Sequence, residues 1–417
     1  MPRHLVRPLE NAWQEVVDAV LRRRGAPATS DVAKLAPRLV ELSRAYNAGL
    51  AGDGARVVVP LDARIAFSFA RDVPKGAGAV RELVLAGALS LPEGRPLRIV
   101  DLGAGLGAMT WGVARALASS ATAAASPPIE ALLVDEDGDA LAAAEAIARE
   151  ASARPGLHAP ALTVRTRKER IFAGMNLPEA DLVMLGQVLS ELDVAMDPAE
   201  RVAKHAALVA DLLGRVVAPG GALVVVEPAL KGRTRHLHAV RDALVDRGTT
   251  VFAPCLHAKH CPVLAAENDW CHEDLPVDLP PWVVPLARAA GLRWQGLTFS
   301  YLVLRRDERR LADELDHVGV GPRLHLRVIS ELLRTKGKAE VFACTEAGER
   351  LRMRRLDRDA TEEGPGAAAT AAWSHLRRGD VVTIRSGAEG AGSGGPPVDE
   401  RGRVSGAAHV DVWPIRK

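Results

Sequence analysis

Aromatic residues, cysteine and net charge are all scarce in this chain of 417 residues. Phe, Trp and Tyr together make up 4%, which argues against a surface that binds single-stranded nucleic acid by base stacking. The formal net charge is only +2, so the overall balance does not indicate a polyanionic partner, although local basic patches could still bind one. No internal repeat is evident.

Long apolar runs are also absent. None reaches the length of a membrane span, and the N-terminal "MPRHLVRPLENAWQEVVDAV" has no apolar signal core. It contains acidic residues early and is not rich in Arg and Ser, so neither a secretory nor a mitochondrial address is expected. These features predict a soluble, cytoplasmic protein.

Apolar residues are plentiful at 48%, which excludes a disordered chain, and the length predicts more than one domain. Apolar residues recur at helical spacing over 8–24, 32–48 and 77–90, so residues 1–90 are predicted to form a helical N-terminal region.

From residue 97 onward, short apolar strands alternate with helices. This alternation predicts an α/β fold with a parallel sheet that is covered by helices on both faces. The expected strands lie in 97–118, 129–150, 161–167, 180–192, 220–230 and 292–306. The fourth is expected to run directly into a helix.

Three regions follow from this pattern. The helical region 1–90 precedes an α/β domain over 91–306, which contains a cysteine-rich insertion at 251–275. A basic, β-rich appendage is predicted over 307–417. Its Gly-rich stretch at 386–398 is expected to be a flexible loop.

A glycine turn follows the first strand. In "VDLGAGLG", Asp101 ends the strand, and Gly103, Gly105 and Gly107 form the turn that opens a helix. Glycines allow a tight turn and let a ligand approach the backbone closely. The turn alone fits either NAD or S-adenosylmethionine. Asp101 would repel a pyrophosphate but suits a cationic ligand, whereas Asp135, after the second strand, could bind the ribose of either.

No catalytic residue can be assigned from the sequence. After the fourth strand, "LGQVLSEL" lacks the Asn/Asp-Pro-Pro-aromatic motif of methyltransferases that act on amino groups. Gln187, Ser190 and Glu191 are placed at the ligand end of the sheet, and Glu191 is expected to serve packing or a helix surface. Methyl transfer needs little beyond positioning, so the missing base does not exclude it.

The cysteines stand close together in an unusual stretch. Three of the four lie in "CLHAKHCPVLAAENDWC", and the fourth follows after 72 intervening residues; they are Cys255, Cys261, Cys271 and Cys344. In a reducing compartment such a group indicates a metal site rather than disulfides. The spacing lacks the short pairs of structural zinc sites, which favours an iron–sulfur cluster over zinc. His257, His260 and His272 are alternative zinc ligands, and buried thiols without a metal are the simpler alternative.

Basic residues gather in two places. Residues 323–358 contain ten Lys and Arg against five Asp and Glu, and "KGRTRH" at 231–236 follows the fifth strand. Such patches can contact RNA phosphates. The alternative is an ordinary solvated Arg-rich surface.

The order of motifs over about 95–306 resembles the class I methyltransferase fold. That resemblance implies S-adenosylmethionine as the cofactor, bound by Asp101, Gly103, Gly105, Gly107 and Asp135. More specifically, the chain resembles methyltransferase-like proteins associated with the small ribosomal subunit in bacteria and mitochondria. The segments that carry this resemblance are "VDLGAGLGAMTWG", "VLSEL", "VVVEPALKG", "APCLHAKHCP", "DWCH", "FSYLVLRR" and "RTKGKAEVFACTEAG".

This family resemblance implies a four-iron–four-sulfur cluster held by the four cysteines, rRNA contact, and a role in ribosome biogenesis or translation. A more specific version of this predicted function adds methyl transfer to rRNA. The alternatives are a methyltransferase of a small molecule or protein with a structural zinc, and a non-enzymatic RNA-binding assembly scaffold. An NAD-dependent oxidoreductase is disfavoured by Asp101 and by the lack of a catalytic Tyr-x-x-x-Lys pair.

Overall fold

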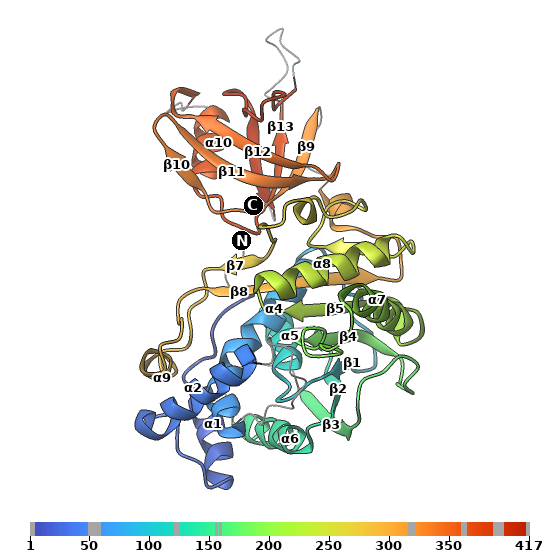
Figure 1. The fold of residues 1–417 in the computed structure, drawn as a ribbon, viewed down its shortest axis with the longest axis vertical. Helices are drawn as coiled ribbons and strands as arrows, with labels where there is room; N and C mark the ends of the chain where they lie inside the picture. Colours follow the sequence, from blue (N-terminus) through green and yellow to red (C-terminus); the bar gives the residue numbers. More distant parts are fainter. Residues whose placement is uncertain are drawn as a thin grey trace.

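The computed structural model of the chain has two sheets, one above the other in Figure 1. It describes residues 5–48, 60–120, 126–154, 157, 161–315, 322–359, 365–386 and 396–413. No helix among these residues combines the length and apolar character that crossing a membrane requires.

The larger sheet has the strand order β3-β2-β1-β4-β5-β8-β6, and a short strand β7 pairs with β8. The strands are β1 (Leu97–Leu102), β2 (Ile129–Asp135), β3 (Leu162–Lys168), β4 (Ala180–Gly186), β5 (Val217–Glu227), β6 (Thr250–Ala253), β7 (Glu273–Leu275) and β8 (Leu297–Arg305). The order reverses between β1 and β4, which places a ligand crevice at their carboxyl ends. This arrangement confirms the predicted class I methyltransferase-like fold.

Helices cover both faces of the larger sheet. They are α1 (Ala12–Arg23), α2 (Val32–Ala48), α3 (Leu61–Ala63), α4 (Phe69–Leu85), α5 (Ala108–Ala118), α6 (Gly138–Ser152), α7 (Pro198–Arg215), α8 (Lys231–Val245) and α9 (Val284–Ala289). A π-helical turn at Arg64–Ser68 joins α3 to α4. One face packs on α4 and α5, and the other on α7 and α8. The N-terminal helices form a third core with α6 and α9.

The second sheet has the order β10-β11-β9-β13-β14, with β12 beside β11, and all of its neighbouring strands are antiparallel. Its strands are β9 (Arg323–Val328), β10 (Leu333–Thr335), β11 (Lys338–Thr345), β12 (Arg350–Leu356), β13 (Val381–Arg385) and β14 (His409–Trp413). Helix α10 (Pro365–Ser374) closes the core of this sheet through the buried Trp373.

Four buried charges join the two sheets. Arg327 of β9 donates to Glu82 of α4 at 2.7 Å and to Glu273 of β7 at 3.2 Å, and Arg81 contacts Glu273 at 2.9 Å. All four side chains are at most 3% exposed. Burial raises the pKa of Glu82, but Arg327 and Arg81 outweigh it, so the net pKa lies below its usual range. We call Arg81, Glu82, Glu273 and Arg327 the buried quartet.

The structure corrects several expectations about secondary structure. The sheet is mixed, because β8 runs antiparallel between β5 and β6. The segment 251–275 is not a separate insertion, since it begins inside β6 and ends with β7. The apolar residues of β6 complete the sheet edge. The predicted three-region division stays a prediction, and most of the predicted loop 386–398 lies outside the described residues.

Candidate functional site

The glycine turn lies where the sequence places it, between β1 and α5. Gly103, Gly105 and Gly107 all have positive φ, at 64°, 51° and 75°. A Cβ at Gly103 would lie 2.4 Å from Cγ2 of Val188, and one at Gly105 would lie 2.8 Å from Nη2 of Arg64. Conformation therefore favours glycine at both positions, and at Gly103 the fixed Val188 side chain leaves no room for a Cβ.

Asp101 lies fully buried beneath this turn. Its Oδ2 accepts hydrogen bonds from the hydroxyl of Thr110 at 2.8 Å and from its backbone N–H at 3.3 Å. Its Oδ1 has no hydrogen-bond partner among the described residues. Burial raises the pKa of Asp101 to about 7. A cation or N–H donor that reaches Oδ1 would therefore stabilise the ionised form of Asp101.

Asp135 ends β2 and faces the same crevice. Its carboxylate accepts from the backbone N–H of Gly105 and of Asp137, both at 2.8 Å. Arg64, from the N-terminal helical region, donates to Asp137 at 2.8 Å. This ion pair connects residues 73 positions apart and closes one wall of the site.

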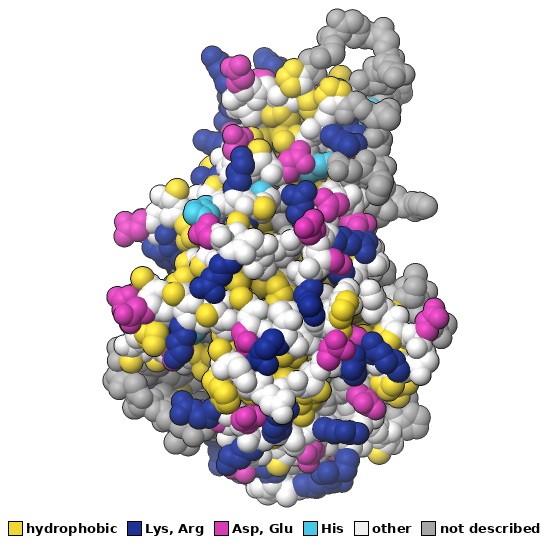
Figure 2. Space-filling view, turned by 90° about the vertical axis from the view of Figure 1, so that its right-hand side faces the viewer, with side chains coloured by type: hydrophobic (Ala, Val, Ile, Leu, Met, Phe, Trp, Pro, Cys, Tyr) yellow, Lys and Arg dark blue, Asp and Glu magenta, His cyan; other side chains and the backbone are white. Residues whose placement is uncertain are grey.

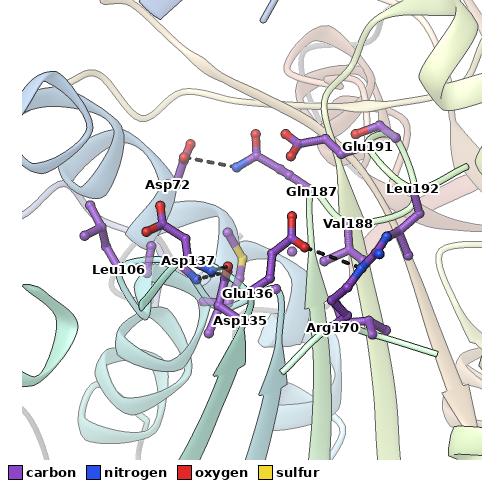
Figure 3. Close-up of a pocket in the computed structure, with 18 of the residues that line it drawn as sticks. Asp72, Leu106, Asp135, Glu136, Asp137, Arg170, Gln187, Val188, Glu191 and Leu192 are labelled. Atoms are coloured by element: carbon purple, nitrogen blue, oxygen red, sulfur yellow. Dashed lines mark hydrogen bonds and ion pairs between the residues drawn. The ribbon is translucent and has the colours of Figure 1, made fainter. Parts of the chain in front are cut away.

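Together these residues line a cavity of about 1200 Å³ at the carboxyl ends of the strands, shown in Figure 3. The predicted residues Gly103, Gly105 and Asp135 line it, while Gly107 caps the helix behind and Asp101 lies underneath. The volume suits a ligand with a nucleoside group and leaves room for a second molecule.

The segment after β4 does not continue into the predicted helix. Gln187 and Asp193 have positive φ, at 63° and 53°, and they are the only non-glycine residues with positive φ in the described ranges. The buried Glu227 side chain accepts from the backbone N–H of Leu189 at 2.8 Å, and Arg201 donates to the backbone carbonyl of Leu189 at 2.6 Å. These contacts fix an irregular turn where sequence periodicity predicts a helix.

Glu191 belongs to this turn rather than to a helix, and its exposed side chain lines the cavity. Its side chain is reached by solvent, but the cavity walls surround it, and this burial raises its pKa despite the nearby Arg233 and Arg64. Tyr46 of α2 lines the same region. Tyr46, Arg64 and Asp72 were not identified from the sequence, because helical periodicity does not show which distant strand a helix will cover.

The four cysteines converge although they come from both sheets. Cys261, Cys271 and Cys344 share a small cluster with Val263 and Ile329. Burial raises the pKa of Cys261 to about 12, and it also raises the pKa of Cys271 and Cys344; Cys255 adds to each of these shifts electrostatically. All four are free thiols.

The predicted metal or iron–sulfur site is not supported at the level of ligand geometry. Within the described part of the chain, no group of three or more His, Cys, Asp or Glu side chains is arranged to hold a metal ion. Of the alternative ligands, His257 lies 3.3 Å from the sulfur of Cys344, whereas His260 pairs with Asp246 at 2.7 Å. His272 stacks on Trp270.

The family model described as "Mitochondrial small ribosomal subunit Rsm22" matches residues 63–376. No curated protein matches the chain.

Solved methyltransferases are similar at low identity. A putative class I S-adenosylmethionine-dependent methyltransferase from Listeria monocytogenes is 12% identical with a TM-score of 0.36, covering 70% of this chain and 86% of that one. Magnesium protoporphyrin IX methyltransferase from Synechocystis is 14% identical with a TM-score of 0.30, covering 70% and 97%. A putative RNA methyltransferase from Pyrococcus horikoshii is 11% identical with a TM-score of 0.30, covering 56% and 81%. At these scores the similarities carry no argument about function.

Proposed function

Because this chain belongs to the mitochondrial small ribosomal subunit Rsm22 family, we propose that it is a methyltransferase-like protein of the small ribosomal subunit that binds S-adenosylmethionine and rRNA. The observation that carries this proposal is the family match, which includes the glycine turn, most of the residues that line the cavity and all four cysteines. The sequence predicts a cytoplasmic protein, whereas the family is described as mitochondrial. We therefore propose the small ribosomal subunit as the place of action and assign no compartment.

The cavity fits a methyl donor by its own chemistry. Gly103 and Gly105 leave the backbone free of side chains, at Gly103 where a Cβ would collide with Val188, and Asp101 holds an unpartnered buried oxygen beneath them. Asp135 would bind ribose hydroxyls at the end of β2. When bound, S-adenosylmethionine supplies an electrophilic methyl group. A cavity of this size, kept open between two sequence regions, favours an enzyme over a scaffold that has lost the ligand site.

Exposed basic residues of the second sheet support rRNA contact. Arg334, Lys336, Arg350 and Arg352 are exposed on or beside β10 and β12, and Arg350 lies 4.2 Å from the ring centroid of Phe342. In Figure 2, Lys and Arg side chains lie between acidic ones over most of the face shown. Distributed cations of this kind suit backbone contacts to folded RNA rather than base readout.

Asp135→Asn is expected to weaken binding of the methyl donor by about 10- to 100-fold, because a charge-assisted hydrogen bond contributes about 1.5–3 kcal/mol. Affinity for small-subunit rRNA should stay unchanged and should fall steeply with added salt. With the full chain, calorimetry measures the affinity for the methyl donor and filter binding measures the affinity for rRNA. The exposed Glu200→Gln serves as the control. A wild-type chain that binds neither ligand would refute the proposed function.

We further propose that the cysteines hold a metal or an iron–sulfur cluster together. The support is chemical, since the four thiols lie close enough that Cys255, Cys261 and Cys344 each raise the pKa of Cys271, and Cys255 and Cys261 raise that of Cys344. Metal binding would displace the thiol protons, so the affinity for metal should rise with pH. Anaerobic purification followed by iron, sulfide and zinc analysis tests the idea and distinguishes iron from zinc.

Cys344→Ser is expected to remove the metal and to increase proteolysis within residues 323–413, because Cys344 is the only one of the four on the second sheet. Metal analysis and limited trypsin digestion measure the two effects. Thr335→Ala, at an exposed position of β10 in the same sheet, is the control. If both metal content and digestion remain at wild-type levels, the cysteines do not act as a shared ligand set.

A further inference from the structure

The orientation of the Gln187 side chain is fixed by a buried ion pair. Asp72 of α4 contacts Nζ of Lys75 at 2.8 Å, and its second oxygen accepts from Nε2 of Gln187 at 3.0 Å (Figure 3). Although burial raises the pKa of Asp72, Lys75 and Arg71 hold it well below its usual range. An ionised carboxylate only accepts hydrogen bonds, so the Gln187 amide must direct its NH₂ group to Asp72.

The consequence is that Oε1 of Gln187 is left for another partner. Gln187 directly follows β4 and lines the cavity. Its backbone is held at positive φ, and its N–H donates to the carbonyl of Val226. Side chains retained on such a strained backbone occur at functional sites, where surrounding contacts hold them in place.

A second hydrogen-bond acceptor comes from the same turn. Glu191 lines the cavity four residues later, beside Tyr46, with which it interacts electrostatically. The neighbouring cations are already engaged, since Arg64 pairs with Asp137 and Arg233 donates to the backbone carbonyl of Tyr46 at 3.4 Å. This end of the cavity therefore presents acceptors and suits a ligand that donates N–H hydrogens.

We propose that Gln187 and Glu191 receive the exocyclic amino group of a flipped-out nucleobase, each accepting one of its N–H hydrogens. The inference rests on the proposed function and adds the class of methyl acceptor. In place of the Asn/Asp-Pro-Pro-aromatic motif, which this turn lacks, it assigns the hydrogen-bond acceptors to Gln187 and Glu191. In the reaction, the nitrogen lone pair forms the new N–C bond to the methyl group, and the C–S bond of the donor breaks with its electron pair staying on sulfur. The released proton passes to the Glu191 carboxylate.

The rim of the cavity favours a nucleobase over a protein side chain. Phe172 is 52% exposed there, which is unusual for a large apolar ring, and it follows Arg170, whose side chain is 86% exposed. Arg170 pairs with Glu136 at 3.5 Å, so the rim carries an exposed aromatic ring for base stacking and an exposed guanidinium for phosphate contact. A base that must reach a reactive centre deep in a cavity has to leave its stack.

The test uses the full chain, tritiated S-adenosylmethionine, and two probes from small subunits of cells lacking this protein: the deproteinised rRNA and the total subunit protein. We expect label in the rRNA as an N-methylated exocyclic amine. Gln187→Ala should lower incorporation at least 100-fold, and Glu191→Gln at least 10-fold, with donor affinity within about threefold of wild type. Glu200→Gln should leave incorporation unchanged.

Other outcomes contradict the inference in distinguishable ways. Label in protein, on a ribose oxygen or on a ring carbon would assign a different acceptor. Donor binding without incorporation into either probe would overturn the acceptor site and leave the proposed donor site intact. Loss of donor binding in the wild type would overturn the proposed function itself. If thermal melting shows that Gln187→Ala is unfolded, the test depends on Glu191→Gln and Asp72→Asn. Wild-type incorporation of label by both variants would then overturn the inference.

Discussion

Replacing Arg327 with methionine is expected to lower the free energy of unfolding by about 3–5 kcal/mol, because the change leaves Glu82 and Glu273 buried with one cation fewer. Arg327 also donates to the backbone carbonyl of Gly379 at 2.9 Å, so a carbonyl loses its partner as well. The loss should appear first in the second sheet. Urea unfolding measures the energy, and limited proteolysis within residues 323–413 locates it.

A matched arginine separates the buried quartet from a general effect of charge. Arg358 follows β12 and is exposed, so Arg358→Met should change stability by no more than about 0.5 kcal/mol. A loss below about 1 kcal/mol for Arg327→Met would mean that the two sheets are held by other contacts. The buried quartet contains no metal, so the stability loss of Arg327→Met should be the same with and without a chelator. The effect of Cys344→Ser, in contrast, should depend on the metal.

Glu227→Gln is expected to abolish a pH dependence of roughly 3 kcal/mol in the wild-type protein. Burial raises the pKa of Glu227 to about 7, from an ordinary value of 4.5. Between these two values the unfolded chain releases the proton while the folded chain keeps it, so wild-type stability from this group falls as pH rises from about 4.5 to 7. Above pH 7 the variant should be more stable than wild type, and near pH 4 the difference should vanish or reverse.

The control for Glu227 is a carboxylate with partners. Glu340 is also buried, but hydrogen bonds from Lys338 and Arg352 outweigh its burial and lower its pKa. Glu340→Gln should therefore destabilise the protein above its ordinary pKa and have a smaller effect in acid. Thermal melting of both variants between pH 4 and 8 measures the two trends. Equal trends for both would show that burial of Glu227 does not control its ionisation.

The sequence was informative wherever one local pattern implied one structure. "VDLGAGLG" predicted the turn of Gly103, Gly105 and Gly107, because glycine takes left-handed conformations far more readily than other residues, and the structure has all three at positive φ. The alternation of strands and helices predicted the α/β fold. It did not predict the antiparallel β8 or the strand at 250–253, because short apolar runs carry no information about direction or partner.

The candidate site shows the same division. Asp135 and Gln187 could be located from the sequence, since each directly follows an expected strand, and parallel strands bring their carboxyl ends to one edge. The residue that the Gln187 side chain contacts could not be predicted, because this partner, Asp72, lies 115 residues earlier on a helix. The irregular turn that carries Glu191 depends on the buried Glu227 and Arg201, whose contacts outweigh local helical preference.

By itself, then, the sequence determined the fold class, the glycine turn and the set of four cysteines, since each depends on local conformation or composition. Only the tertiary structure decided that Asp72 orients Gln187, that the cysteines of two sheets meet, and that Arg327 lies between Glu82 and Glu273. These pairings join residues far apart in the chain. Their energies come from burial and charge that exist only after the chain has folded.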